Sequence, residues 1–168
     1  MEQLSHDNHE TSITQRSIRI FAEQLTSPYN VGSLFRLADA LGISKVYFGG
    51  ETPLPPNRKI YKTSRSTDRI IPFEHVQDAS LLFTDLKEQD YELIALELCD
   101  ESIPLNDIKL EKNRPICLIL GDEKTGVSQL SLDAANQVVH IPMHGKNSSM
   151  NVIQACSIAA YTILNQQL

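Results

Sequence analysis

Short apolar runs alternate along the chain with longer segments in which apolar positions recur every three or four residues. The short runs predict β-strands, because a run of four to eight apolar or alternating residues is too short for a stable helix. The predicted strands cover residues 18–25, 46–48, 91–96, 116–120 and 138–141, with a short extended segment at 70–73.

The longer segments predict three helices. The first is capped by Asn30 and runs to residue 41, where Gly42 ends it. The second is amphipathic and covers 79–89, and the third closes the chain from residue 150 to residue 165. Strands that alternate with helices predict a parallel sheet covered on both faces, which is a Rossmann-like α/β fold.

The size of the chain limits it to one domain. It has 168 residues, 41% of them hydrophobic, which is enough for a single core and leaves no room for a second substrate domain. Residues 1–16 contain three acidic residues and two histidines but few large apolar ones. We therefore expect a flexible tail there, followed by a domain over 17–168, with no signal peptide and no membrane span.

The cysteines and histidines indicate neither disulfides nor a metal site. Cys99, Cys117 and Cys156 are odd in number and lie far apart in apolar stretches, which is typical of reduced core thiols in a cytoplasmic protein. His140 and His144 are separated by Pro142, so they cannot share a helical face, and no metal is expected.

A ligand site is predicted where the apolar run 116–120 ends. It leads directly into the polar loop G-D-E-K-T-G at 121–126. Because open α/β sheets bind ligands beyond the carboxyl ends of their strands, this loop is the first candidate for a binding site.

Three motifs surround that loop in sequence. The first is N-V-G-S-L-F-R at 30–36, with Ala38, Ala40 and Gly42 after it; the second surrounds Glu123; the third runs from I-P-M at 141–143 to S-M-N at 149–151. In order and spacing they resemble the motifs of the SpoU (TrmH) class of SPOUT RNA 2′-O-ribose methyltransferases. The resemblance covers residues 17–168. Met150 replaces a usual leucine, and 62–68 matches only the style of the family's variable loop.

The resemblance implies a SPOUT-type Rossmann-like parallel sheet with a deep C-terminal trefoil knot. General rules of chain topology predict an unknotted sheet, but they admit exceptions and hydrophobic periodicity cannot detect a knot. The resemblance also implies methyl transfer from S-adenosylmethionine to a ribose 2′-hydroxyl of tRNA or rRNA. Small family members without extensions include tRNA wobble-position enzymes, which favours tRNA.

The resemblance places five residues in the active site: Asn30, Arg36, Glu123, Ser149 and Asn151. Taken alone, Arg36 would be an exposed helical residue, Glu123 a loop carboxylate and Ser149 a helix cap. The family's matching arginine has been proposed to activate the ribose hydroxyl. Because arginine stays protonated at any accessible pH, we expect Arg36 instead to hold a phosphate and stabilise negative charge on the attacking oxygen.

Cofactor binding and assembly are also implied by the resemblance. S-adenosylmethionine would contact backbone groups of Leu120, Gly121, Ile141, Met143 and Met150. The closing helix is apolar on both sides, more than one core contact requires, and family members dimerise through this helix. Both features predict a homodimer with a composite site.

The charge distribution bears on RNA binding. The net charge of −6 opposes a polyanionic partner, but five of the 15 basic residues fall within 12 positions whose only acid is Asp68: Arg58, Lys59, Lys62, Arg65 and Arg69. An isolated cluster of this kind is as often a solvated loop. Its position beside the first motif predicts that it holds an RNA backbone.

Two other functions compete with methyl transfer. The first is a non-catalytic RNA- or nucleotide-binding module with the same fold, against which the joint presence of the five predicted catalytic residues argues. The second is a dinucleotide-dependent dehydrogenase, but no G-x-G-x-x-G opens any predicted helix. Binding of S-adenosylhomocysteine or of NAD distinguishes these classes.

Overall fold

The computed structural model describes residues 17–146 and 149–166, and the expected tail at 1–16 lies outside this range. Within the described residues, seven strands form one sheet with the order β3-β2-β1-β6-β4-β7-β5, and every pair is parallel. The strands are β1 (Ile18–Ala22), β2 (Lys45–Phe48), β3 (Phe73–His75), β4 (Glu92–Leu96), β5 (Ile103–Pro104), β6 (Ile116–Leu120) and β7 (Gln137–His140). The prediction of an α/β fold with a parallel sheet is confirmed.

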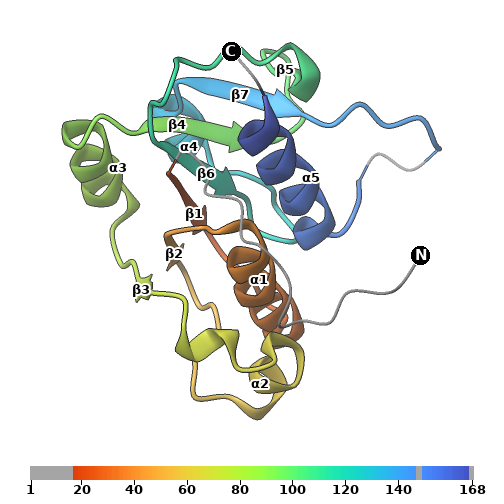
Figure 1. Cartoon of the computed structure of the whole chain (residues 1–168). Helices are drawn as coiled ribbons and strands as arrows, with labels where there is room; N and C mark the ends of the chain where they lie inside the picture. Colours follow the sequence, from red (N-terminus) through yellow and green to blue (C-terminus); the bar gives the residue numbers. More distant parts are fainter. Residues whose placement is uncertain (1–16, 147–148, 167–168) are drawn as a thin grey trace, which may run out of the picture.

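Helices cover both faces of this sheet (Figure 1). One face carries α1 (Pro28–Leu41) and α5 (Val152–Asn165), with α2 (Arg58–Ser64) beside α1. The other face carries α3 (Ala79–Glu88) and α4 (Gln129–Ala134). Two 3-10 helices, η2 (Thr67–Arg69) and η3 (Leu105–Asp107), lie in the connections. None of the helices in the described ranges is long and apolar enough to cross a membrane.

The central strand β6 belongs to both hydrophobic cores. Ile116, Leu118 and Leu120 pack in the core beneath α1 and α5, while Cys117 and Ile119 pack in the core beneath α3. Successive strand residues point to opposite faces, so a strand covered on both faces has to be apolar throughout. This requirement explains why the five-residue apolar run in the sequence forms the centre of the sheet.

The first helix begins earlier than predicted. Ser27 occupies the N-cap position and Pro28 the first turn, so the prediction that Asn30 caps this helix is wrong. Proline suits the first turn because its missing N–H would have no helical partner there. Asn30 instead lies inside the first turn, where its backbone N–H donates to the Ser27 carbonyl over 3.0 Å. Its side chain is therefore not used as a cap.

The last helix begins later than predicted. It starts at Val152 rather than at residue 150, and its cap is Asn151. Ser148, one of the two serines considered as caps, lies outside the described residues, and Ser149 lies two positions before the cap. The asparagine takes this position because its carboxamide oxygen reaches two free backbone N–H groups of the first turn.

Several short elements were not predicted. Helices α2 and α4 have seven and six residues, too few for a helical apolar period to appear in the sequence. The segment predicted to be extended at 70–73 is a strand only from Phe73 onward, because η2 precedes it and the Ile71 N–H still donates to the Thr67 carbonyl. The strand β5 contributes only two residues to the edge of the sheet.

Helix α2 packs closely on α1 at Gly32. A Cβ atom added to Gly32 would lie 2.1 Å from the Thr63 hydroxyl oxygen and 2.3 Å from the Ile60 carbonyl oxygen. The Thr63 hydroxyl also donates to the Tyr29 carbonyl over 3.0 Å. The glycine of the first motif is thus required by the distance between the two helices.

We expect Gly32→Ala to lower the free energy of unfolding by about 1–3 kcal/mol, because the backbone of α2 has to move to admit the methyl group. Gly145→Ala is the matched control, since a Cβ atom at Gly145 would have no neighbour within 4 Å. Urea denaturation of the two variants and the parent measures the difference. Equal midpoints for both variants would show that the two helices do not need this glycine.

Candidate active site

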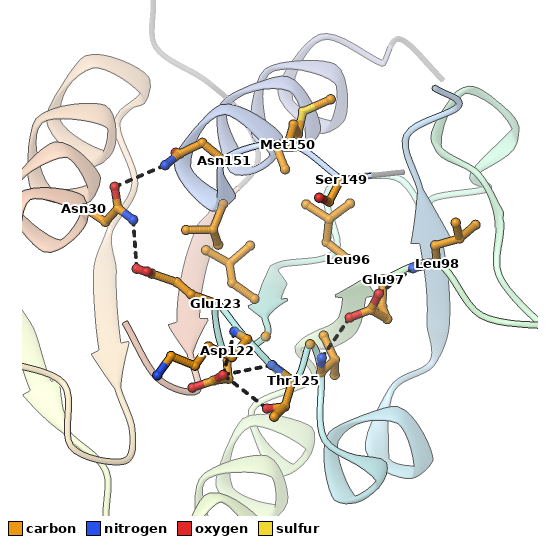
Figure 2. A pocket seen from close by; sticks show the side chains of 17 residues that line it. Asn30, Leu96, Glu97, Leu98, Asp122, Glu123, Thr125, Ser149, Met150 and Asn151 are labelled. Carbon is orange, nitrogen blue, oxygen red and sulfur yellow. Dashed lines mark hydrogen bonds between the residues drawn. The ribbon is translucent and has the colours of Figure 1, made fainter. Parts of the chain in front are cut away.

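A cleft of about 790 Å³ lies beyond the carboxyl ends of β4 and β6. Its walls come from the ends of these strands, the loop after β6, and the first turns of α1 and α5 (Figure 2). The volume is in the usual range for a small-molecule site, and the position is the one at which open α/β sheets bind ligands.

The loop after β6 is a tight turn closed by Asp122 and Gly126. Their backbones exchange two hydrogen bonds of 2.9 and 3.0 Å, and the Asp122 carboxylate accepts from the N–H groups of Lys124 and Thr125. The bond from Lys124 is the largest of the effects that lower the pKa of Asp122. A lowered pKa means that the folded state favours the ionised carboxylate. The hydrogen bonds of this carboxylate therefore stabilise the turn until the pH falls through the lowered pKa.

Both glycines of this loop are needed for its shape. A Cβ atom on Gly121 would lie 2.2 Å from the carbonyl carbon of Gly126, and Gly126 itself has φ of +74°. A Cβ atom on Gly126 would lie 2.4 Å from Oε2 of Glu97, which accepts from the Val127 N–H over 2.8 Å. Glu97 thereby joins the end of β4 to the end of the loop.

A chain of side-chain hydrogen bonds crosses the mouth of the cleft (Figure 2). Asn30 Nδ2 donates to Oε1 of Glu123 over 2.7 Å, and Asn151 Nδ2 donates to Oδ1 of Asn30 over 3.3 Å. The second oxygen of Glu123 accepts from the Thr26 hydroxyl over 3.2 Å. These bonds connect the loop after β6 with the N-terminal ends of α1 and α5, although the residues lie more than 90 positions apart in the sequence.

Asn151 has two functions in this arrangement. Its Oδ1 accepts from the backbone N–H groups of Ile153 and Gln154 over 2.9 and 3.4 Å, which caps α5. Its Nδ2 group remains available to donate to Asn30. The start of the closing helix is therefore held to the first motif by one side chain.

The structure brings most of the predicted site residues together. Four of the five predicted catalytic residues line the cleft, together with three of the predicted cofactor residues: Asn30, Glu123, Ser149, Asn151, Leu120, Gly121 and Met150. Ile141 and Met143 line an adjoining cavity of about 140 Å³, whose wall also includes Leu96, Ser149 and Met150. The predicted cofactor residues thus line two cavities that share part of their walls.

Arg36 is the exception among the predicted catalytic residues. It is exposed on α1 and belongs to the lining of neither cavity. Six helical residues separate it from Asn30, a rotation of about 240°, so the two side chains leave the helix in different directions. Within the described residues it makes no hydrogen bond or ion pair.

The predicted RNA-binding residues form a separate exposed surface. Arg58, Lys59 and Lys62 lie on α2, Arg65 caps its carboxyl end, and Arg69 ends η2. This segment is mostly helical. Helix α2 adjoins α1, which also supplies Asn30 to the cleft.

Hydrogen bonding and burial describe the remaining histidine and cysteine side chains near the sheet. In the described ranges no group of three or more His, Cys, Asp or Glu residues could hold a metal ion, and His140 bonds to the Ser102 hydroxyl over 2.9 Å. Cys117 and Cys156 are free thiols, and burial raises the pKa of each to about 12. Both remain protonated at neutral pH.

Sequence reasoning missed Thr26 and Glu97, and it gave Asp122 no definite function within the candidate loop. Thr26 and Glu97 lie in segments with no motif, and only the folded chain brings them to Glu123 and Val127. The turn at Asp122 could have been predicted from the sequence, because an aspartate that accepts from backbone N–H groups two and three positions later is typical of an Asx turn.

Comparison with known proteins identifies the family. Residues 17–161 match the sequence profile of the SpoU rRNA Methylase family, and this range includes all three motifs. The chain belongs to this family. The tRNA (guanosine(18)-2′-O)-methyltransferase of Escherichia coli K12 is 28% identical over 153 residues. The match covers 91% of this chain and 65% of that protein, so the chain spans less than two thirds of its length.

Solved structures of SpoU proteins share the fold. The A. aeolicus TrmH/SpoU tRNA modifying enzyme superposes with a TM-score of 0.79 at 23% identity, covering 91% of this chain and 77% of the other. The SpoU methyltransferase AviRb from Streptomyces viridochromogenes, in complex with AdoMet, gives 0.77 at 22% identity, covering 98% and 62%. The parallel sheet of this SpoU family member is therefore shared with enzymes of low sequence identity.

The double function of Asn151 can be tested by stability. We expect Asn151→Ala to lower the free energy of unfolding by about 1 kcal/mol, because two backbone donors of α5 lose their acceptor. Asn151→Asp should stay within about 0.5 kcal/mol of the parent, because a carboxylate accepts the same bonds and suits a helix N-terminus.

Gln154→Ala, an exposed substitution in the same helix turn, is the control for helix propensity. Denaturant unfolding at neutral pH is the measurement. If the aspartate variant were as unstable as the alanine variant, the bond to Asn30 rather than the cap would be the stabilising one.

Proposed function

We propose that this chain is an S-adenosylmethionine-dependent methyltransferase that modifies a ribose 2′-hydroxyl of tRNA or rRNA. The observation that carries the proposal is the hydrogen-bonded set Asn30, Glu123 and Asn151 at the mouth of a cleft beyond the central strand. Family membership supports it, as does the name of the E. coli relative, a tRNA 2′-O-methyltransferase.

The cleft has the properties that this cofactor requires. Apolar side chains of Leu96, Leu98 and Met150 line it beside the polar loop at 121–126, and its volume suits a ligand of nucleoside size. Backbone groups of Leu120 and Gly121, with Ile141, Met143 and Met150 from the adjoining wall, would hold the adenosine and methionine parts. The bound cofactor supplies an electrophilic methyl group, and no metal is needed for that chemistry.

The side chains of the network would act by position and charge. Glu123 accepts one bond at each carboxylate oxygen, from Asn30 and from Thr26, so it is a positioning residue that fixes the asparagine at the mouth. The guanidinium group of Arg36 would hold an RNA phosphate and stabilise negative charge on the ribose oxygen. The hydroxyl proton would leave to water or to an RNA phosphate.

A homodimer would complete this site. Arg36 is exposed outside the cleft of its own chain, and α5, which contacts α1, presents Ile158 and Tyr161 with 42% and 60% of their surface exposed. We propose that two copies associate through α5, so that Arg36 takes part in a composite site. Of the apolar residues predicted on the second side of this helix, Ile158 is exposed, whereas Ile153 is buried and Leu164 packs on the core.

The topology and location complete the proposal. We propose that the C-terminal segment forms a trefoil knot. In support of this, β6 lies between β1 and β4, the segment after β7 lines a cavity with the end of β4, and Ser149, Met150 and Asn151 line the cleft with the end of β6. Protonated, unpaired thiols at Cys117 and Cys156 fit a reducing compartment, so we place the protein in the cytoplasm.

A non-catalytic RNA-binding module is the second candidate, and the position of Arg36 outside the cleft favours it. Calorimetric titration with S-adenosylhomocysteine and with NAD, followed by transfer of labelled methyl groups to tRNA and to rRNA, tests both functions. Binding of S-adenosylhomocysteine with methyl transfer supports the enzyme. Binding without transfer to either RNA supports the module, and failure to bind S-adenosylhomocysteine contradicts the enzyme.

Arg36→Ala should lower methyl transfer by about 10²–10³-fold, because it removes a fixed charge that stabilises the reacting oxygen. Affinity for S-adenosylhomocysteine should change by less than about threefold, since Arg36 lies outside the cleft. Arg36→Lys should restore little of the methyl transfer activity, because an ammonium group does not replace the two parallel hydrogen bonds of a planar guanidinium. Asp39→Ala, another exposed substitution on α1, is the control. Equal losses of cofactor affinity and activity would contradict this role.

The dimer is tested by Ile158→Glu. We expect sedimentation of the parent to show a dimer at micromolar concentration and this variant to be monomeric, because a carboxylate would be buried in the apolar contact. Ile163→Glu cannot serve this purpose, since Ile163 is fully buried within its own chain. Leu81→Glu, which changes a residue 69% exposed on α3, is the control. A monomeric, active parent would refute the composite site.

A further inference from the structure

A second concave surface lies on the outer side of α2, away from the cleft. It has a volume of about 720 Å³, and its walls include Pro55, Pro56 and Tyr61. None of its lining residues belongs to the cleft beyond β6 or to the adjoining cavity. The proposed cofactor site does not include this pocket, so the combination of apolar and polar groups in it needs a separate explanation.

One part of this pocket pairs an exposed aromatic ring with a guanidinium group. Tyr61 is 51% exposed, and the guanidinium carbon of Arg69 lies 5.5 Å from the centre of its ring. An exposed tyrosine ring and a guanidinium plane are the two kinds of group on which proteins stack unpaired RNA bases. The proline rings beside them add rigid apolar surface.

Asn57 and Asp68 add a hydrogen-bond donor and an acceptor to this pocket. Oδ1 of Asn57 accepts from the N–H groups of Lys59 and Ile60 over 2.9 and 3.4 Å, so its Nδ2 group is the donor that remains for a ligand. Oδ1 of Asp68 accepts from the Ser64 hydroxyl, which leaves Oδ2 as an acceptor. A phosphate would be repelled by Asp68, whereas the edge of a base carries N–H donors that a carboxylate accepts.

Positive charge surrounds the pocket. Arg58 and Arg69 line it, and Lys59, Lys62 and Arg65 are exposed on the same short segment of a chain with a net charge of −6. Cations around a stacking surface with a single acid inside are complementary to a nucleotide, whose phosphate is charged and whose base is not.

We propose that this pocket binds one unstacked base of a single-stranded RNA segment, stacked on Tyr61 and Arg69, while the neighbouring cations hold the phosphates. This inference rests on the proposed function, because it assigns to the same substrate RNA a nucleotide remote from the methylated ribose. The contact at Gly32 and the bond from Thr63 to Tyr29 hold α2 against the first turn of α1, next to Asn30. A base held on α2 is thereby kept at a set distance from the cleft. Because the base has to be unstacked to enter the pocket, we expect the substrate to be looped rather than duplex RNA.

The test compares a fluorescently labelled oligouridylate with an oligomer of the same length that lacks bases. For the full chain, Tyr61→Ala should weaken oligouridylate binding by about ten- to a hundred-fold, and Tyr61→Phe should stay within about twofold, because phenylalanine keeps the ring. Neither variant should change the dependence of affinity on salt. Lys62→Ala/Arg65→Ala should flatten that dependence, since it removes phosphate contacts, whereas Lys109→Ala/Lys112→Ala, an equal change of charge elsewhere, should not.

Three results would overturn the inference. One is equal affinity of the parent for the two oligomers, and another is an equal loss on both in Tyr61→Ala, which would mean a purely electrostatic or structural role. The third is unchanged oligouridylate binding by Tyr61→Ala. If that variant also changed its oligomeric state, the pocket would be a contact between copies of the chain.

The same preparations separate this inference from the proposed function. Methyl transfer by the parent together with unchanged RNA binding by Tyr61→Ala would overturn the base pocket alone. Base-dependent binding through Tyr61 in a protein that neither binds S-adenosylhomocysteine nor transfers methyl groups would overturn the enzymatic proposal alone.

Discussion

Burial of β6 on both faces is the constraint on which the rest of this structure depends. The strand pairs with β1 on one side and β4 on the other, and its five residues are at most 1% exposed. A strand with neighbours on both edges and helices on both faces has to be apolar, and the chain has to leave it abruptly to reach solvent. Gly121 makes that exit possible because the returning backbone of Gly126 occupies the space of a side chain. The loop with Glu123 is therefore set at the carboxyl edge of the sheet by the packing of the strand before it.

The site then depends on how this loop is joined to its neighbours. Glu97 holds its end to β4, Asp122 closes its turn, and Glu123 is bonded to Asn30 on α1, which is bonded in turn to Asn151 on α5. Each of these bonds is exposed or partly exposed, so each contributes little alone. Because they link four segments in series, they determine the relative positions of the groups more than they determine the stability of the fold. Preorganisation of this kind is what a reaction accelerated by positioning requires.

Helix α1 connects the cleft with the outer surface of the molecule. The helix carries Asn30 toward the cleft, receives α2 at Gly32 and exposes Arg36. Methyl transfer to a large RNA needs both a confined cofactor and contacts with a substrate much larger than the cleft. A single helix that contacts both the cleft and the cationic segment offers a direct physical connection between the two.

The sequence by itself determined the class of fold, the central strand and the group of residues around the cleft. These features have local signatures: an apolar run has to be buried, and a glycine-bounded polar loop after it has to lie at the edge of the sheet. The motif resemblance named Asn30, Glu123, Ser149 and Asn151, all of which line the cleft. Tertiary structure alone decided that Asn151 rather than a serine caps α5, that Thr26 and Glu97 support the loops, and that Arg36 lies outside the cleft of its own chain. Hydrogen bonds between segments 90 or more residues apart, as between Glu123 and Asn30, leave no period or spacing in a sequence. The pocket beside Tyr61 was equally hidden, because η2 and the short helix α2 bring its walls together only through their packing against α1.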